Sequence, residues 1–175
     1  MSAIPLERFH DLSALPAAGY ELEIVPRKDE LHTLAKWAGV DEVLQLTAHV
    51  FVQAQSKTHF VEEAQFEADI VQSCVVTLQP VRTHIVRSFT RVLHLMPVIQ
   101  RFADTDEAAA ARAVGEDSPD EIDSPVYDLG TPLREEFALA INPYPRAPGV
   151  AFEPPADQDV PESPFAVLGK LKRRS

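Results

Sequence analysis

Four arginines in the middle of the chain have the right chemistry to bind phosphate groups. They are Arg82, Arg87, Arg91 and Arg101, and the stretch from residue 70 to residue 103 contains no carboxylate. Guanidinium groups bind phosphate oxygens through charge-assisted, often bidentate hydrogen bonds. If these side chains gather on one face of a twisted sheet, they form a small basic patch that contacts RNA. The alternative is an ordinary solvated sheet face.

The single cysteine and the histidines give little sign of metal or redox chemistry. Cys74 has no second cysteine to pair with, so no intrachain disulfide can form. Its apolar neighbours predict a small buried side chain on the apolar face of a strand. His84 and His94 are ten residues apart, which matches no known ligand spacing. We therefore expect no metal and no cofactor.

Sequence motifs of enzymes are missing from the chain. There is no Gly-x-Ser-x-Gly elbow, no phosphate-binding loop and no His-Glu-x-x-His pair. Pairs of acidic residues are common, but most lie in a polar stretch that would not fix their carboxylates in a catalytic arrangement. We expect no catalytic residues, with a nuclease or RNA-modifying enzyme as the less favoured alternative.

Charge is distributed unevenly along the 175 residues, whose formal net charge is −11. Residues 101–169 carry most of the excess negative charge, whereas residues 170–175 hold four basic residues and no carboxylate. An acidic chain repels nucleic acid at long range, so the sign fits a basic partner such as a ribosomal protein. The acidity also fits a role in solubility alone.

The last residues resemble a docking peptide at the end of an extended arm. Seven prolines lie between residues 143 and 164, a composition typical of an extended segment. A short apolar cluster follows and could dock on a partner, while the basic residues at 170–174 would add attraction to RNA. Folding back onto the domain, or disorder, is the alternative. The cluster consists of Phe165, Val167, Leu168 and Leu171.

The first elements of the chain are marked by clear periodicity. Residues 20–25 alternate between apolar and acidic side chains, which predicts a half-buried strand ended by Pro26. Residues 28–38 place apolar side chains at helical spacing, which predicts a helix with one buried face. Gly39 then stands where a left-handed C-cap is expected.

Three long strands should follow, joined by short polar connections that permit antiparallel pairing. The first is predicted at 43–54, the second runs through Phe66 to Val76 and includes Cys74, and the third covers roughly 83–95 after a break at Pro80. Arg87 and Arg91 share the parity of the apolar residues in the third strand, so we expect a bulge or twist there.

The second half of the chain contains an acidic stretch and one helix. Residues 104–123 carry eight carboxylates, which predicts a mobile acidic loop with one helical turn near 108–114. A helix through residues 133–141 should follow, capped by Thr131 with Pro132 at its first position and ended by Pro143.

Together these elements predict an α+β fold, with a mainly antiparallel sheet or partly open barrel and two main helices. We expect one domain over residues 1–146, including the acidic insertion, followed by a Pro-rich arm and basic tail over 147–175. No secretory signal and no apolar stretch long enough to span a bilayer is visible, so we expect a cytoplasmic protein.

Three segments of the chain carry short motifs. Their residues are Cys74 and Pro80 at the strand end, Asp128, Leu129, Gly130 and Glu135 around the last helix, and Pro143, Tyr144 and Pro145 at the start of the proline-rich stretch. In this order the three segments resemble the YceD family, the bacterial large ribosomal RNA subunit accumulation proteins. Many family members have a second cysteine three residues after the first, where this chain has Thr77. A zinc or redox role for that pair is therefore not supported here.

The resemblance implies a non-enzymatic factor that supports accumulation or processing of large-subunit rRNA. It would bind an rRNA precursor or a basic ribosomal protein, and no small-molecule substrate or membrane. A chaperone-like binder of a basic ribosomal protein, without RNA contact, is the alternative that the acidic stretch favours.

Overall fold

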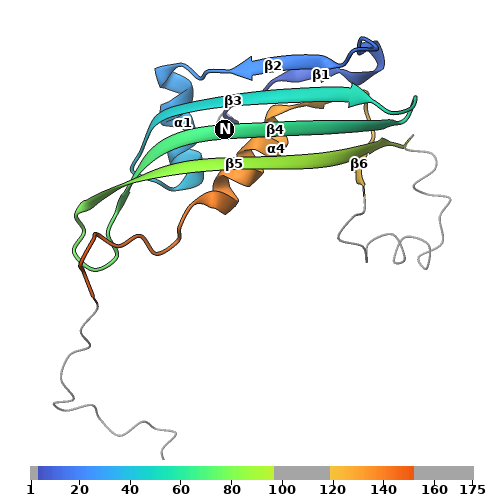
Figure 1. The fold of residues 1–175 in the computed structure, drawn as a ribbon. Coiled ribbons are helices and arrows are strands. Elements are labelled where there is room, and N and C mark those ends of the chain that lie inside the picture. Colours follow the sequence, from blue (N-terminus) through green and yellow to red (C-terminus); the bar gives the residue numbers. More distant parts are fainter. Residues whose placement is uncertain (1–3, 97–118, 152–175) are drawn as a thin grey trace, which may run out of the picture.

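The computed structural model describes residues 4–96 and 119–151, which form a five-stranded sheet, a two-stranded sheet and two α-helices (Figure 1). The large sheet has the order β2-β3-β4-β5-β6 and is not closed, because β2 and β6 stand at its two edges. Its strands are β2 (Tyr20–Ile24), β3 (Glu42–Ala54), β4 (His59–Ser73), β5 (Pro80–Leu95) and β6 (Asp120–Ile122). All neighbours are antiparallel except β5 and β6. The predicted α+β class is confirmed, with an open sheet.

The hairpin of β4 and β5 is the longest feature of the sheet. Its register runs without interruption from His59 opposite His94 to Ser73 opposite Pro80. The prediction that Cys74 and Val76 belong to the second long strand is wrong, since β4 ends at Ser73 and both residues lie in the turn. Pro80 begins β5 rather than breaking it, which fits a residue that has no N–H to donate.

The irregularity of the sheet lies in β3 and not in β5. The expected bulge near Arg87 and Arg91 is wrong, because pairing of β5 with β4 shows no register shift. A shift occurs instead between Val43 and Gln45. This bulge turns Val43 into the core and leaves Leu44 partly exposed.

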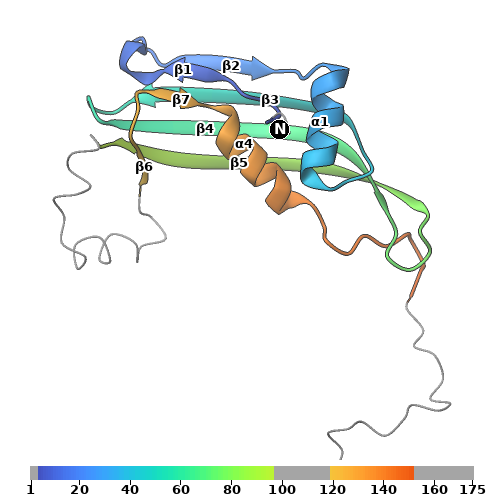
Figure 2. The ribbon, with the colours of Figure 1, turned by 180° about the vertical axis from the view of Figure 1, so that it is seen from behind.

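Both helices pack on the same face of the large sheet, which we call the helix side (Figures 1 and 2). Helix α1 (Lys28–Ala38) contacts β3, and helix α4 (Gly130–Ala140) contacts β5. The rings of Phe66 on β4 and Phe137 on α4 meet edge to face, with centroids 6.2 Å apart. Such aromatic pairs add about 0.5–1.5 kcal/mol beyond the apolar area that they bury.

Helix α1 has the predicted bounds and the predicted C-cap. The side chain of Glu30 accepts a hydrogen bond from the N–H of Arg27, which satisfies one free donor at the start of the helix. Gly39 follows the helix with φ of 71°, a left-handed conformation that glycine adopts at little cost.

Several short elements were not predicted from the sequence. Strands β1 (Phe9–Asp11) and β7 (Val126–Asp128) pair antiparallel as a separate two-stranded sheet on the helix side, and a 3-10 helix (Leu12–Ala14) follows β1 (Figure 2). Strand β6 lies inside the region 104–123 that was predicted to be a mobile loop. It pairs with Leu93–Leu95, whereas the predicted helical turn at 108–114 lies outside the described residues.

Helix α4 starts where the chain passes very close to the N-terminal segment. A Cβ placed on Gly130 would lie 1.8 Å from the carbonyl oxygen of Leu6, which is backbone and cannot move aside easily. Glycine is thus required at this position by close approach, since its φ is not in the left-handed region. The contact fixes the start of α4 against residues before β1.

We predict that Gly130→Ala destabilises the protein by about 2–4 kcal/mol, because the new methyl group must push the two backbone segments apart. Gly39→Ala is a suitable control, since nothing lies within 4 Å of its Cβ and only the left-handed φ costs about 1 kcal/mol. Urea unfolding measures both. Equal losses in the two variants would contradict the close-approach explanation.

Candidate functional site

The side of the large sheet opposite the helices carries no helix or strand of the described chain, and we call it the open face (Figure 1). Because side chains alternate along a strand, every second residue points to this face. Register places Glu21, Phe51, Glu63 and Thr90 in one row across β2 to β5. Glu23, His49, Gln65 and Ser88 form the next row. The sheet therefore presents a set of polar and acidic side chains with an aromatic ring among them.

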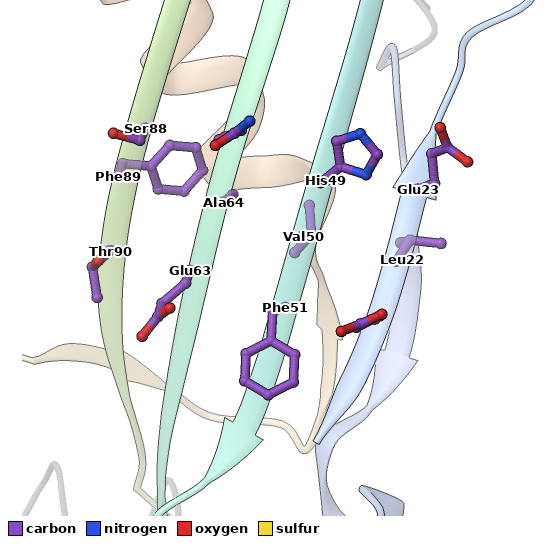
Figure 3. Close-up of a pocket in the computed structure, with 12 residues that line it drawn as sticks. Leu22, Glu23, His49, Val50, Phe51, Glu63, Ala64, Ser88, Phe89 and Thr90 are labelled. Atoms are coloured by element: carbon purple, nitrogen blue, oxygen red, sulfur yellow. The ribbon is translucent and has the colours of Figure 1, made fainter. Parts of the chain in front are cut away.

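These two rows line a shallow hollow of about 930 Å³ in the open face (Figure 3). Phe51 and His49 stand on β3, with Glu23 on one side and Glu63 on the other. The Phe51 ring packs closely over Gly19, where an added Cβ would lie 2.4 Å from the ring. The hollow is thus a rigid floor of β-strands with carboxylates along both sides.

The glutamates around the hollow have no cationic partner within residues 4–96 and 119–151. Glu21, Glu23 and Glu63 are all exposed, and none forms an ion pair with another described residue. Glu67, one row further along β4, is likewise exposed and unpaired within the described residues. Unpaired like charges on one face raise the local negative potential, which attracts cations.

Further along the same face, Asp69 is the centre of a paired cluster. Its carboxylate accepts hydrogen bonds from Gln45 Nε2 at 2.7 Å and Arg82 Nη2 at 3.1 Å, and lies 3.0 Å from His84 Nδ1. The hydrogen bond with His84, helped by Arg82, holds the pKa of Asp69 below its ordinary value. Arg82 is therefore already engaged on a carboxylate, although its side chain is largely exposed.

The three described arginines of the predicted basic patch do not share one face of the sheet. Arg82 lies on the open face, whereas Arg87 is opposite Phe66 and points to the helix side together with Arg91. Arg91 is bound by three carboxylates, Asp120 at 3.5 Å, Glu135 at 3.5 Å and Glu136 at 3.1 Å. Of the three predicted arginines that the structure describes, Arg87 alone is exposed and forms no ion pair with a described residue. Arg101 lies outside the described residues.

Glu62 is a buried carboxyl that the sequence analysis missed. It lies on the helix side of β4 opposite Arg91, is 0% exposed, and neither oxygen has a hydrogen-bond partner within the described part of the chain. Burial, and then the charge of Asp128, raises its pKa to about 8 despite the opposing effect of Arg91. Extending the alternation of Phe66, Ala68 and Ile70 backwards would have placed Glu62 on the inner face.

The Asp128-Leu129-Gly130 motif holds the start of α4. The Asp128 carboxylate accepts hydrogen bonds from the N–H groups of Arg8 and Gly130, the Thr131 hydroxyl and the Arg134 guanidinium. Burial pushes the pKa of Asp128 upward, but these donors outweigh it and hold the pKa below the ordinary value. The predicted cap, Thr131, is wrong: Asp128 supplies the acceptor, and Pro132 is the third helical residue rather than the first.

Leu129 is fully buried beside this carboxylate, and the Arg134 side chain is almost so. Arg134 also donates to the carbonyl of Pro5, so the motif ties the N-terminal segment, β7 and α4 together. Glu135, the remaining motif residue in this region, is exposed and bound to Arg91. The motif therefore has a structural role in the described chain.

The other two motif regions also meet in space, at the turn between β4 and β5. Cys74 is fully buried, as predicted, and its Sγ accepts a hydrogen bond from the N–H of Ala147 at 3.3 Å. The Val75 N–H binds the carbonyl of Pro145, and Gln72 Nε2 binds that of Asn142. The Thr77 hydroxyl, followed by the Ala147 N–H, lowers the pKa of the Cys74 thiol to about 6. The first part of the arm is thus attached to this turn.

Exposed apolar side chains surround the tip of that turn. Leu78 is 77% exposed and Tyr144 is 72% exposed, while Pro143 is exposed and Pro145 is buried.

The predicted docking residues Phe165, Val167, Leu168 and Leu171 lie outside the described residues. In the part of the chain that is described, no three metal-binding side chains converge, and neither helix has the length and apolar character needed to cross a bilayer.

No protein-family model, no curated protein and no solved structure matches this chain.

We predict that Glu62→Gln makes stability less dependent on pH. The folded pKa of Glu62, about 8, is above its ordinary value of 4.5, so unfolding releases a proton between these values. Stability should fall as pH rises through this window and level off above pH 8. Glutamine mimics the protonated acid. It should stabilise the protein by on the order of 4 kcal/mol at high pH, and by little when the pH is below 4.5, the ordinary pKa of a glutamate.

Urea unfolding from acidic to alkaline pH tests this prediction. Glu63→Gln, the exposed neighbour, is the control and should follow the wild-type pH profile. If Glu62→Gln shows the same profile as the wild type, Glu62 does not bind a proton in the folded protein at neutral pH.

We predict that Asp128→Ala costs about 3–5 kcal/mol, because it leaves the buried Arg134 without its carboxylate. Asp11→Ala is the control: this exposed carboxylate caps the 3-10 helix through Ser13, and its loss should cost about 1 kcal/mol. Chemical denaturation gives both values. A loss below that of the control would show that Asp128 does not hold the start of α4.

Proposed function

We propose that this protein is a non-enzymatic binding factor that supports accumulation or processing of large-subunit ribosomal RNA in the cytoplasm. The sequence support is the ordered set of YceD-like motifs. The structural support is that these motifs join at two places, the start of α4 and the turn after β4. Residues far apart in the sequence are thereby shown to serve one folded unit.

The observation that carries the proposal is the open face of the sheet. The motif residues attach α4 and the arm to the helix side and to one end of the sheet, so the opposite face stays uncovered by described residues (Figures 1 and 2). A rigid sheet with a hollow of about 930 Å³ is a suitable binding platform. The function that this geometry supports best is binding of another macromolecule.

A second candidate, chaperone-like binding of a basic ribosomal protein without RNA contact, is favoured by charge. The hollow is lined by glutamates that no described cation neutralises, and these repel phosphate groups. Among the described arginines, Arg82 lies on the face opposite to that of Arg87 and Arg91, and both Arg82 and Arg91 are bound to carboxylates. A protein partner therefore fits the described surface better than an RNA partner.

We predict that the tagged protein co-sediments with precursors of the large ribosomal subunit in sucrose gradients of cell extract. Mass spectrometry of these fractions identifies its companions, and nuclease treatment before pull-down separates protein-mediated from RNA-mediated binding. Retention of a ribosomal protein after nuclease would support the second candidate. If the protein in an extract of growing cells sediments only at the top of the gradient, the proposed function is refuted.

A further inference from the structure

We propose that the open face binds an extended, Lys/Arg-rich segment of a protein partner, which lies along β3. This inference rests on the proposed function and names the class of partner. It is drawn from the arrangement of the hollow, in which strand β3 forms the floor and carboxylates from β2 and β4 stand on either side.

The geometry provides two acidic walls at a distance that suits one extended chain. Neighbouring strands lie about 4.8 Å apart, so the side chains of β2 and β4 are about 10 Å from each other across β3. Glu23 on β2 and Glu63 on β4 stand on the two sides of β3 (Figure 3), and the register places Glu21 on the same side as Glu23. A segment lying on β3 can send successive side chains alternately toward the two walls.

The floor of the hollow favours a cation with an apolar stem. The Phe51 ring stands between Glu21 and Glu63, and a guanidinium over such a ring gains both a cation–π contact and carboxylate hydrogen bonds. Val86 and Val92 on β5 are also exposed on this face, at 57% and 37%. The methylene stems of lysine and arginine can cover these apolar groups while their charged ends reach the carboxylates.

The charge balance excludes the opposite kind of ligand. None of the glutamates at the hollow is neutralised by a described cation, so each is free to form a charge-assisted hydrogen bond with an incoming one. The same carboxylates would repel a phosphate backbone. The open face therefore selects a basic polypeptide over a nucleic acid.

The test uses the full chain and a fluorescein-labelled peptide of alternating Arg and Gly, with binding measured by fluorescence anisotropy. The variant Glu21→Gln/Glu23→Gln/Glu63→Gln should bind the peptide at least about tenfold more weakly. The matched control, Glu7→Gln/Asp29→Asn/Asp123→Asn, removes the same charge from exposed carboxylates away from the hollow. It should stay within about twofold of the wild type, and wild-type binding should weaken as salt is added.

Equal weakening in both triple variants would overturn the inference, because binding would then follow net charge and not the hollow. The inference would also be overturned if single-stranded RNA bound more tightly than the peptide and the hollow variant lost this RNA binding. A third outcome would overturn the inference. If the peptide binds only after Lys170, Lys172, Arg173 and Arg174 have been neutralised, the basic end of this chain, and not a partner, occupies the hollow. Circular dichroism of each variant confirms that the fold is kept.

The outcome is separable from that of the proposed function. A wild-type chain that co-sediments with precursor particles but ignores the peptide would refute this inference alone. A chain that binds the peptide through the hollow but never co-sediments with ribosomal particles would refute the proposed function alone.

Discussion

The buried pair of Asp128 and Arg134 is the interaction on which the arrangement of the domain depends. It joins the segment before β1, strand β7 and helix α4 at one point, and the close contact between Gly130 and Leu6 completes it. With α4 fixed there, Phe137 and Leu133 close the helix side of the sheet. Both helices are then on that side, which leaves the open face as the surface that can meet a partner.

The large elements could be predicted from the sequence because their periodicity is long and regular. Eleven residues of helix α1 and the thirteen of β3 repeat their apolar pattern often enough to exclude other structures. Strands β1, β6 and β7 could not be predicted, since three residues hold no period and their pairing depends on partners far away in the sequence. The candidate site was missed for a similar reason: Glu21, Phe51 and Glu63 become neighbours only through the register of three strands.

The arginines show how a correct observation led to a wrong structure. Arg87 and Arg91 do share the parity of the core residues, but no bulge moves them outward. β5 pairs with β6 only at Leu93–Leu95, so most of its outer edge has no strand beside it among the described residues. Charged side chains on the inner face of such an edge discourage another strand from adding to it. Arg91 is accommodated by the acidic side chains of α4 and β6, and Arg87 is exposed.

The two-stranded sheet of β1 and β7 has a consequence for the order in which the domain is completed. Strands β2 to β5 follow one another in the chain and can pair as they leave the ribosome, whereas Phe9 must wait for Asp128 to be synthesised. Until then α1 is the only described helix that covers the apolar side of this long meander. The newly made protein therefore exposes an apolar sheet surface until helix α4 has been synthesised and packs on it.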